Sequence, residues 1–163
     1  IPETSFFEGE FSRIVNDKIA EDCSDFSVLE EEDYGIEEKI DEIKSETRIL
    51  ENEIEVNVDY PIFIIENESS LGFSEFSYEI PVRVGHSIDV SKLLVDKIRQ
   101  EPNSTDLTFL LNQDVDVSIL DFDECNKIYV LIDGESKVND ELYSFSFAVK
   151  IDDKYCTGAE NEI

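Results

Sequence analysis

Residue types that build common catalytic and metal sites are scarce in this chain. It has no methionine, one histidine (His86) and three cysteines (Cys23, Cys125 and Cys156) among 163 residues. No CxxC pair occurs, and a single histidine cannot complete a His-rich site, so the usual zinc centres are excluded. The chain also has no glycine-rich phosphate loop and no nucleophile-elbow motif. We therefore expect a protein that is not an enzyme, and we assign no catalytic or cofactor-binding residue.

Basic residues are also few. The chain has 13 Lys and Arg against 41 Asp and Glu, which gives a net charge of −28. Nucleic-acid binding needs clustered Lys and Arg, so we expect no nucleic-acid partner. Like charges repel in the compact state, and salt screens that repulsion. The composition fits either adaptation to a salty medium or a solvated surface that keeps a secreted or crowded protein soluble.

Long apolar runs are absent. No stretch approaches the roughly 18 apolar residues that a membrane-spanning helix needs, so this chain does not itself span a membrane. The sequence begins Ile1-Pro2 and contains no Met, whereas a primary translation product normally starts with Met. We expect a processed protein or a fragment, attached to a membrane only through a segment that this chain lacks.

The composition that remains is that of a folded α+β protein. Hydrophobic residues make up 40% of the chain and are rich in Ile, Val and Phe, which favour strands. Ala, the best helix former, occurs only three times. The length is that of one ordinary domain, so we predict a single domain over residues 1–163.

An amphipathic helix is predicted over residues 5–26. Ser5 and Glu8 have the spacing of a capping box, in which each side chain bonds the backbone of the other. One apolar stripe along the helix is formed by Phe7, Phe11, Val15 and Ile19. We predict that this stripe is an assembly face toward an anchor or neighbouring subunits; the alternative is that it packs on the protein's own sheet.

The rest of the chain reads as strands and one further helix. The acidic segment 29–42 is predicted to be a loop, and a body over 43–151 contains about six antiparallel strands. One of these strands is predicted over 76–84, and another over 128–132, which is apolar on both faces and therefore central, is followed by a polar loop over 134–140. Pro61 indicates an edge or a bulge, and Asp89 is expected to cap a helix over 89–100. Residues 104–113 are predicted to form a helical turn or loop, and 152–163 a frayed tail. The prediction is a mainly antiparallel sheet, with the N-terminal helix and the second helix packed on one face.

Two local features are weak site candidates. A disulfide between Cys23 and Cys125 is the first pairing to test, and buried unpaired thiols are the alternative. Asp121, Asp123 and Asn126 place oxygen ligands around a tight turn, although the run lacks the EF-hand glycine and terminal Glu. We expect no cofactor other than weak, nonspecific calcium at this turn; a plain turn is the alternative. Sequons at Asn67 and Asn103 matter only in an exported protein.

The order of segments resembles a domain of uncharacterised surface proteins in small-genome archaea of the DPANN group. The similar segments are CSDFS from Cys23, EIEVNVDYPIFI from Glu53, EIPVRVG from Glu79, and IYVLIDGESKVNDELYSFSFAVK from Ile128. The similarity covers roughly residues 15–150. Those proteins carry a pilin-like or signal-anchor segment before their extracytoplasmic part, so the resemblance implies a location outside the membrane. It implies no known activity, and a salt-dwelling member would account for the acidity.

Together, these observations predict an extracytoplasmic, archaeal cell-surface or filament-associated protein. Its role would be structural or adhesive, through self-assembly or contacts with other surface proteins. A soluble extracytoplasmic module that binds a small ligand or divalent cation is the alternative, and an enzyme is the least favoured class.

Overall fold

The computed structural model describes residues 1–23, 25–101, 112–123 and 125–152, and it has the predicted α+β class. Seven antiparallel strands form two sheets, one of four strands and one of three, where the sequence predicted a single sheet of about six. The contacts divide the chain into two compact units. The N-terminal unit contains Pro2–Ile49 and Ile54–Ile80, and the C-terminal unit contains Ile1, Leu50–Glu53 and Pro81–Ile163. One domain over residues 1–163 stays a prediction.

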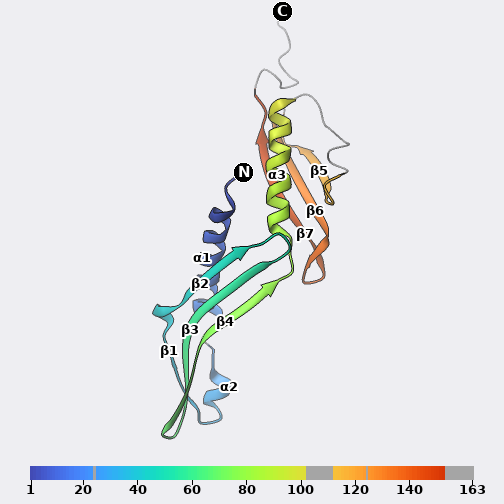
Figure 1. The fold of residues 1–163 in the computed structure, drawn as a ribbon. Coiled ribbons are helices and arrows are strands. Elements are labelled where there is room, and N and C mark those ends of the chain that lie inside the picture. The colour runs from blue at the N-terminus through green and yellow to red at the C-terminus, as the bar shows by residue number, and fades with distance from the viewer. Residues whose placement is uncertain (24, 102–111, 124, 153–163) are drawn as a thin grey trace, which may run out of the picture. The chain divides into compact units, whose positions relative to one another are not determined.

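The elements of the N-terminal unit are α1 (Thr4–Asp22), α2 (Ser27–Glu30), β1 (Gly35–Glu38), the short 3-10 helix η1 (Ile40–Glu42), β2 (Lys44–Ile49), β3 (Ile54–Glu66) and β4 (Ser69–Ile80). Those of the C-terminal unit are α3 (Val84–Gln100), β5 (Asp116–Asp121), β6 (Asn126–Val138) and β7 (Glu141–Lys150). Figure 1 shows both sets.

Strand β3 organises the N-terminal sheet because it is longer than its neighbours on one side. Its first half pairs with β2 and its second half with β1, while β4 runs along its other side (Figure 1). The β3–β4 register shifts between Asp59 and Ile62, which places a bulge at Pro61 as the sequence predicted. The acidic segment predicted as a loop contains β1 and η1, because Ile36 pairs with Ile64 on the extended half of β3.

Helix α1 packs against β2, and its start differs from the prediction. The helix begins at Thr4 after Glu3 and ends at Asp22, and its first residue has no side-chain cap. The predicted capping box between Ser5 and Glu8 is wrong, because the Glu8 carboxylate bonds the backbone of β2 instead. Cys23 follows the helix, so α1 ends four residues before the predicted end at residue 26, and α2 begins only after that predicted end.

Pro81 directly follows the last residue of the N-terminal unit, and two predicted elements differ from the structure around it. The strand predicted over 76–84 ends at Ile80, since proline cannot donate to a sheet. Helix α3 begins at Val84, five residues before the predicted cap Asp89, which is exposed within the helix. The predicted element over 104–113 falls largely outside the described residues.

The C-terminal unit is a three-stranded meander, β5–β6–β7, that packs against α3. Its core contains Val90 of α3, Val115 just before β5, and Leu131 of β6. Phe145 and Phe147 of β7 pack beside these three residues. Strand β6 is central, as its apolar character on both faces predicted. It continues to Val138, through residues that were predicted to be a loop, and turns into β7 at Asn139–Asp140, where both residues have positive φ. No described helix has the length and hydropathy of a membrane-spanning segment.

Candidate protein–protein interface on the N-terminal unit

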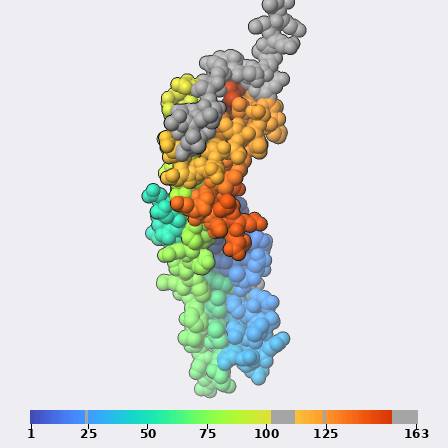
Figure 2. All heavy atoms as spheres, turned by 90° about the vertical axis from the view of Figure 1, so that its right-hand side faces the viewer, coloured from blue at the N-terminus to red at the C-terminus, as the bar shows by residue number. Residues whose placement is uncertain are grey.

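Strand β4 is an open edge of the N-terminal sheet. Among the described residues it pairs only with β3, and of its twelve residues eleven are exposed and Ile80 is half-buried. Its sequence, SSLGFSEFSYEI, has no Lys, no Arg and no Pro. Natural edge strands are usually shortened, charged, interrupted or covered, because an open strand edge pairs readily with other chains. β4 is long, has no lysine or proline, and has only two charged residues, Glu75 and Glu79, so its edge is a candidate interaction surface. Figure 2 shows this light-green strand on the surface.

The opposite edge of the sheet is closed by α1. The amide of Thr47 donates to Ser12 Oγ at 2.9 Å, and the amide of Ile49 donates to Glu8 Oε1 at 3.0 Å. Ser45 Oγ also donates to the Ser12 carbonyl at 2.7 Å. The first two bonds satisfy amides on the outer edge of β2, which have no hydrogen-bond partner on a neighbouring strand. The unit thus protects the β2 edge with a helix and leaves the β4 edge open.

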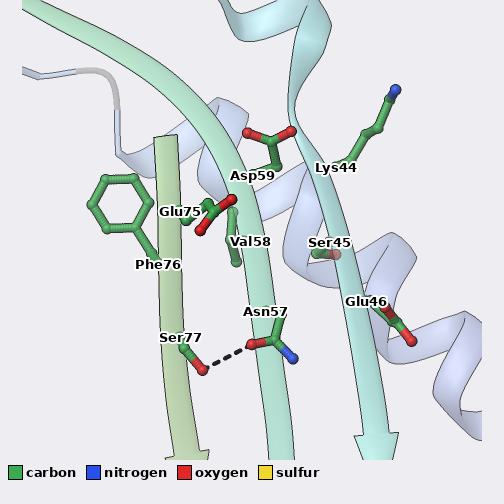
Figure 3. A pocket seen from close by; sticks show the side chains of 9 residues that line it. All are labelled: Lys44, Ser45, Glu46, Asn57, Val58, Asp59, Glu75, Phe76 and Ser77. Carbon is green, nitrogen blue, oxygen red and sulfur yellow. Dashed lines mark hydrogen bonds between the residues drawn. The ribbon is translucent and has the colours of Figure 1, made fainter. Parts of the chain in front are cut away.

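A groove of about 630 Å³ lies on the sheet face opposite α1. Figure 3 shows its nine lining residues, three from each of β2, β3 and β4: Lys44, Ser45, Glu46, Asn57, Val58, Asp59, Glu75, Phe76 and Ser77. Ser77 Oγ donates to Asn57 Oδ1 at 2.8 Å. Six of these residues are polar and exposed and share this face, whereas Ser45, Val58 and Phe76 occupy the intervening positions, whose side chains point to the other face. The groove is therefore a solvated sheet surface.

Carboxylates face each other across this side of the sheet. The register places Asp59 opposite Glu75 and Glu55 opposite Glu79. Like charges directly opposite each other in a sheet are destabilising. On the β2 side, the same two β3 residues face cations, because Lys44 lies opposite Asp59 and Arg48 opposite Glu55. Negative charge is therefore balanced at β2 and left in excess along β4.

Apolar side chains are exposed along the same strand. Phe76 and Tyr78 lie on the other face of β4, and Tyr78 is 70% exposed. Beyond the bulge, Leu71 and Phe73 pair with Ile64 and Ile62 and are themselves exposed. Clusters of exposed apolar residues on a soluble protein mark interaction sites.

Gly72 of β4 lies close to the ring of Phe63 on β3. A Cβ at position 72 would lie 2.9 Å from the ring of Phe63, which is its cross-strand partner. The absence of a side chain therefore allows the Phe63 ring to lie across β4.

The stripe predicted as an assembly face is half-buried. Phe7, Phe11, Val15 and Ile19 all have intermediate exposure, whereas Phe6 and Ile14 of the same helix are exposed. Contact with β2 is made on the side of Glu8 and Ser12. The outward apolar positions of α1 are therefore Phe6 and Ile14, which the sequence reading did not select. Whether the predicted stripe takes part in assembly stays a prediction.

In the C-terminal unit a buried polar cluster surrounds Asp133. Its carboxylate accepts bonds from Arg83 Nε at 2.9 Å, Arg83 Nη2 at 2.5 Å, the Glu135 amide at 3.0 Å and Ser136 Oγ at 2.5 Å. Asp133 is fully buried. The Arg83 guanidinium is the main cause that lowers the pKa of Asp133 to about 2, against the opposing effect of burial. Both carboxylate oxygens of Asp133 accept hydrogen bonds from the protein itself, so this cluster is structural.

The negative charge of Asp133 also contributes to a raised pKa of the neighbouring Tyr143. Burial, with the negative charge of Asp133, raises the pKa of Tyr143 to about 12. Asp133 and Tyr143 are paired across β6 and β7, next to an irregularity in the register between Asp133 and Lys137. Sequence reasoning missed the cluster because Asp133-Gly134-Glu135-Ser136 has the composition of a polar loop.

The predicted calcium turn connects β5 and β6. Asp123 Oδ1 accepts from the amides of Cys125 and Asn126, each at 2.8 Å, and Asn126 Nδ2 donates to both Asp123 oxygens. These hydrogen bonds, the Asn126 side chain first, lower the pKa of Asp123. Asp121 lies 3.4 Å from Lys127 Nζ. In the part of the chain that the structure describes, no three His, Cys, Asp or Glu side chains gather as metal ligands. Weak calcium binding stays a hypothesis, with Asp123 already engaged in the turn.

The predicted disulfide between Cys23 and Cys125 is wrong. Cys23 is a free, exposed thiol after α1, whereas Cys125 is disulfide-bonded. The two residues belong to different compact units, so the ends of predicted elements gave no guide to their pairing. Cys156, the third cysteine of the sequence, lies outside the described residues.

The remaining candidates have ordinary structural roles or stay untested. His86 Nε2 lies 3.0 Å from the carbonyl oxygen of Gln113, as in a satisfied structural histidine. Asn67 of the first sequon is exposed in the β3–β4 turn, and the second sequon at Asn103 lies outside the described residues.

Comparison with protein-family models, with curated proteins and with solved structures finds no match to this chain. The resemblance to archaeal surface proteins therefore stays a prediction.

Proposed function

We propose that this chain is a cell-surface or filament-associated protein of structural or adhesive function, acting through protein–protein contacts outside the membrane. The observation that carries the proposal is the set of exposed apolar side chains on β4 and α1: Leu71, Phe73, Phe76, Tyr78, Phe6 and Ile14. Contact with another protein would remove these side chains from water. The acid-rich surface is suited to such a role in a salty medium.

The proposal is tested by locating the protein in the organism that makes it. Immunogold electron microscopy with an antibody against the chain is expected to label the outer cell surface or surface filaments. Gold particles confined to the cell interior would overturn the proposal.

A pair of variants tests whether the apolar side chains hold the protein there. Phe6→Ser combined with Ile14→Ser is expected to release the protein into the medium, because both side chains are exposed on α1. The matched control is Leu120→Ser with Phe122→Ser, which removes two exposed apolar side chains from the C-terminal unit. Equal release by both pairs would count against a specific role for α1.

The groove on the β2–β3–β4 face is the observation that favours the alternative, a soluble module for a small ligand or divalent cation. Thermal unfolding with and without millimolar calcium tests whether this groove binds a divalent cation. We expect calcium to shift the melting temperature equally in the wild type and in the Asp59→Asn variant, because it screens acidic side chains in general. A shift lost specifically in the variant would support the alternative.

A further inference from the structure

Two rows of charged side chains cross the N-terminal sheet, and each has an unbalanced carboxylate at β4. One row runs Lys44, Asp59, Glu75 from β2 through β3 to β4. A second row runs Arg48, Glu55, Glu79 in the same order. Each row begins with a cation at the edge covered by α1 and ends with a carboxylate at the open edge.

The cations on β2 do not offset the outer carboxylates. Each row has two negative charges and one positive charge. Arg48 also bonds Glu46 on its own strand, with Nε at 3.0 Å and Nη2 at 2.8 Å from Oε1. Attraction between charges falls with distance and with exposure to water, so the carboxylates at β4 are the least balanced of each row. A cation beyond Glu75 and another beyond Glu79 would give each row two cations for its two carboxylates.

The other face of β4 has apolar side chains at the intervening positions. Phe76 and Tyr78 alternate with Glu75, Ser77 and Glu79 along the strand, and both are exposed. A neighbouring strand would place its side chains directly opposite these, on the same face. The open edge therefore favours a neighbouring strand that has basic residues on the face of Glu75 and Glu79 and apolar residues on the face of Phe76 and Tyr78.

We propose that the β4 edge docks an extended segment of a partner protein that has Lys or Arg at positions i and i+4 and apolar residues at i+1 and i+3. The segment adds a strand beside Glu75–Glu79, its backbone bonding the open edge and its basic side chains facing the two carboxylates. This inference rests on the proposed role in protein–protein contacts and names the partner's chemistry.

The chain's own β2 shows that this pattern suits the sheet. Lys44 and Arg48 are four residues apart and face Asp59 and Glu55 from the other side of β3. The incoming segment repeats that spacing on the β4 side. A second copy of β4 is less suited, because it would bring Glu75 and Glu79 of both copies together without any cation.

The test uses the full chain and a synthetic peptide of sequence TTKVSVRTT, acetylated and amidated at its ends. Its basic and apolar residues have the required spacing in either strand direction. Binding is followed by two-dimensional NMR at millimolar peptide, with amide hydrogen exchange as the second readout. We expect alternate amides along β4 to become protected from exchange, since the residues of a strand point their amides alternately to its two edges.

Matched variants separate strand addition from general attraction between a cation and an acidic protein. Glu75→Gln with Glu79→Gln is expected to weaken peptide binding about fivefold at low salt, because two cross-strand charge pairs are lost. Asp116→Asn with Glu141→Gln removes the same charge from exposed positions in the C-terminal unit and should leave binding unchanged. The peptide TTEVSVETT, and the first peptide N-methylated at its three central amides, should not bind.

Three results would overturn the inference: no protection of β4 amides, equal weakening by both variant pairs, or protection of β4 by a second copy before peptide is added. The localisation experiment is independent of these outcomes. Surface labelling without peptide binding would reject the partner chemistry alone, and peptide binding by a protein found inside the cell would reject the surface role alone.

Discussion

Asp133 shows how one buried charge can be held by its surroundings. Its side chain is 0% exposed, and four donors from Arg83, Glu135 and Ser136 occupy the carboxylate. The folded-state pKa of about 2 lies below the usual value near 3.9. The ionised form therefore stabilises the fold at pH values above about 4, and this contribution is lost as pH falls from about 4 to about 2.

Replacing Asp133 tests this ion pair. Asp133→Asn should lower the free energy of unfolding by about 3 kcal/mol at neutral pH, because it leaves Arg83 near a neutral amide. Urea unfolding should show that the gap between variant and wild type narrows as pH approaches 2. Comparing the two proteins at each pH cancels the protonation of the many other carboxylates. Asp116→Asn, at an exposed position, is the control and should change stability by less than about 0.5 kcal/mol. A gap that is constant with pH would contradict this assignment.

At the scale of elements, α1 and β2 are joined by side-chain bonds to strand amides. Ser12 Oγ accepts from the Thr47 amide and donates to the Glu8 carbonyl, both at 2.9 Å. Glu8 in turn accepts from the Ile49 amide. The helix therefore replaces a missing neighbouring strand. This explains why β2 and β4, which are both outer strands, have different surroundings.

Removing the Ser12 hydroxyl tests this edge closure. Ser12→Ala should destabilise the protein by about 1 kcal/mol, since the unpaired Thr47 amide outweighs the better helix propensity of alanine. NMR hydrogen exchange should be faster at the Thr47 amide in the variant. Ser5→Ala, at an exposed position of the same helix, is the control and should leave that exchange rate unchanged. Unaltered exchange at Thr47 in the Ser12 variant would show that α1 does not protect the β2 edge.

At the scale of the whole molecule, charge is the dominant property. A net charge of −28 concentrates repulsion in the folded chain, and only 13 basic residues oppose it. The Debye length falls from about 10 Å at 0.1 M salt to about 3 Å at 1 M, which removes most repulsion between exposed groups.

Stability should therefore rise with salt. The melting temperature is expected to increase between about 0.1 M and about 2 M KCl, because screening lowers the free energy of the folded state more than that of the expanded chain. A variant with Lys at the four acidic positions 30–33, all exposed, should show a smaller increase. A flat profile for the wild type would remove the idea of adaptation to salt.

Local patterns predicted many elements of this fold. A period of two from Ile43 to Ile49 predicted β2, alternation of apolar and polar residues from Ile54 predicted β3, and Pro61 marked the bulge. The boundaries and the second sheet were harder to predict. Pro81 ends β4, and the start of α3 lies beside an arginine whose side chain is fixed by Asp133, fifty residues away. No local pattern contains that pairing.

The sequence by itself determined the α+β class, the acidic surface and the alternation that gives each strand a polar and an apolar face. These properties follow from composition and from the period of side chains along a strand. The tertiary structure decided which edge α1 covers, which carboxylates face each other and which cysteine stays free. Each depends on pairing between segments distant in sequence. The open edge of β4 is such a property, because an edge is defined only once every strand has found its neighbours.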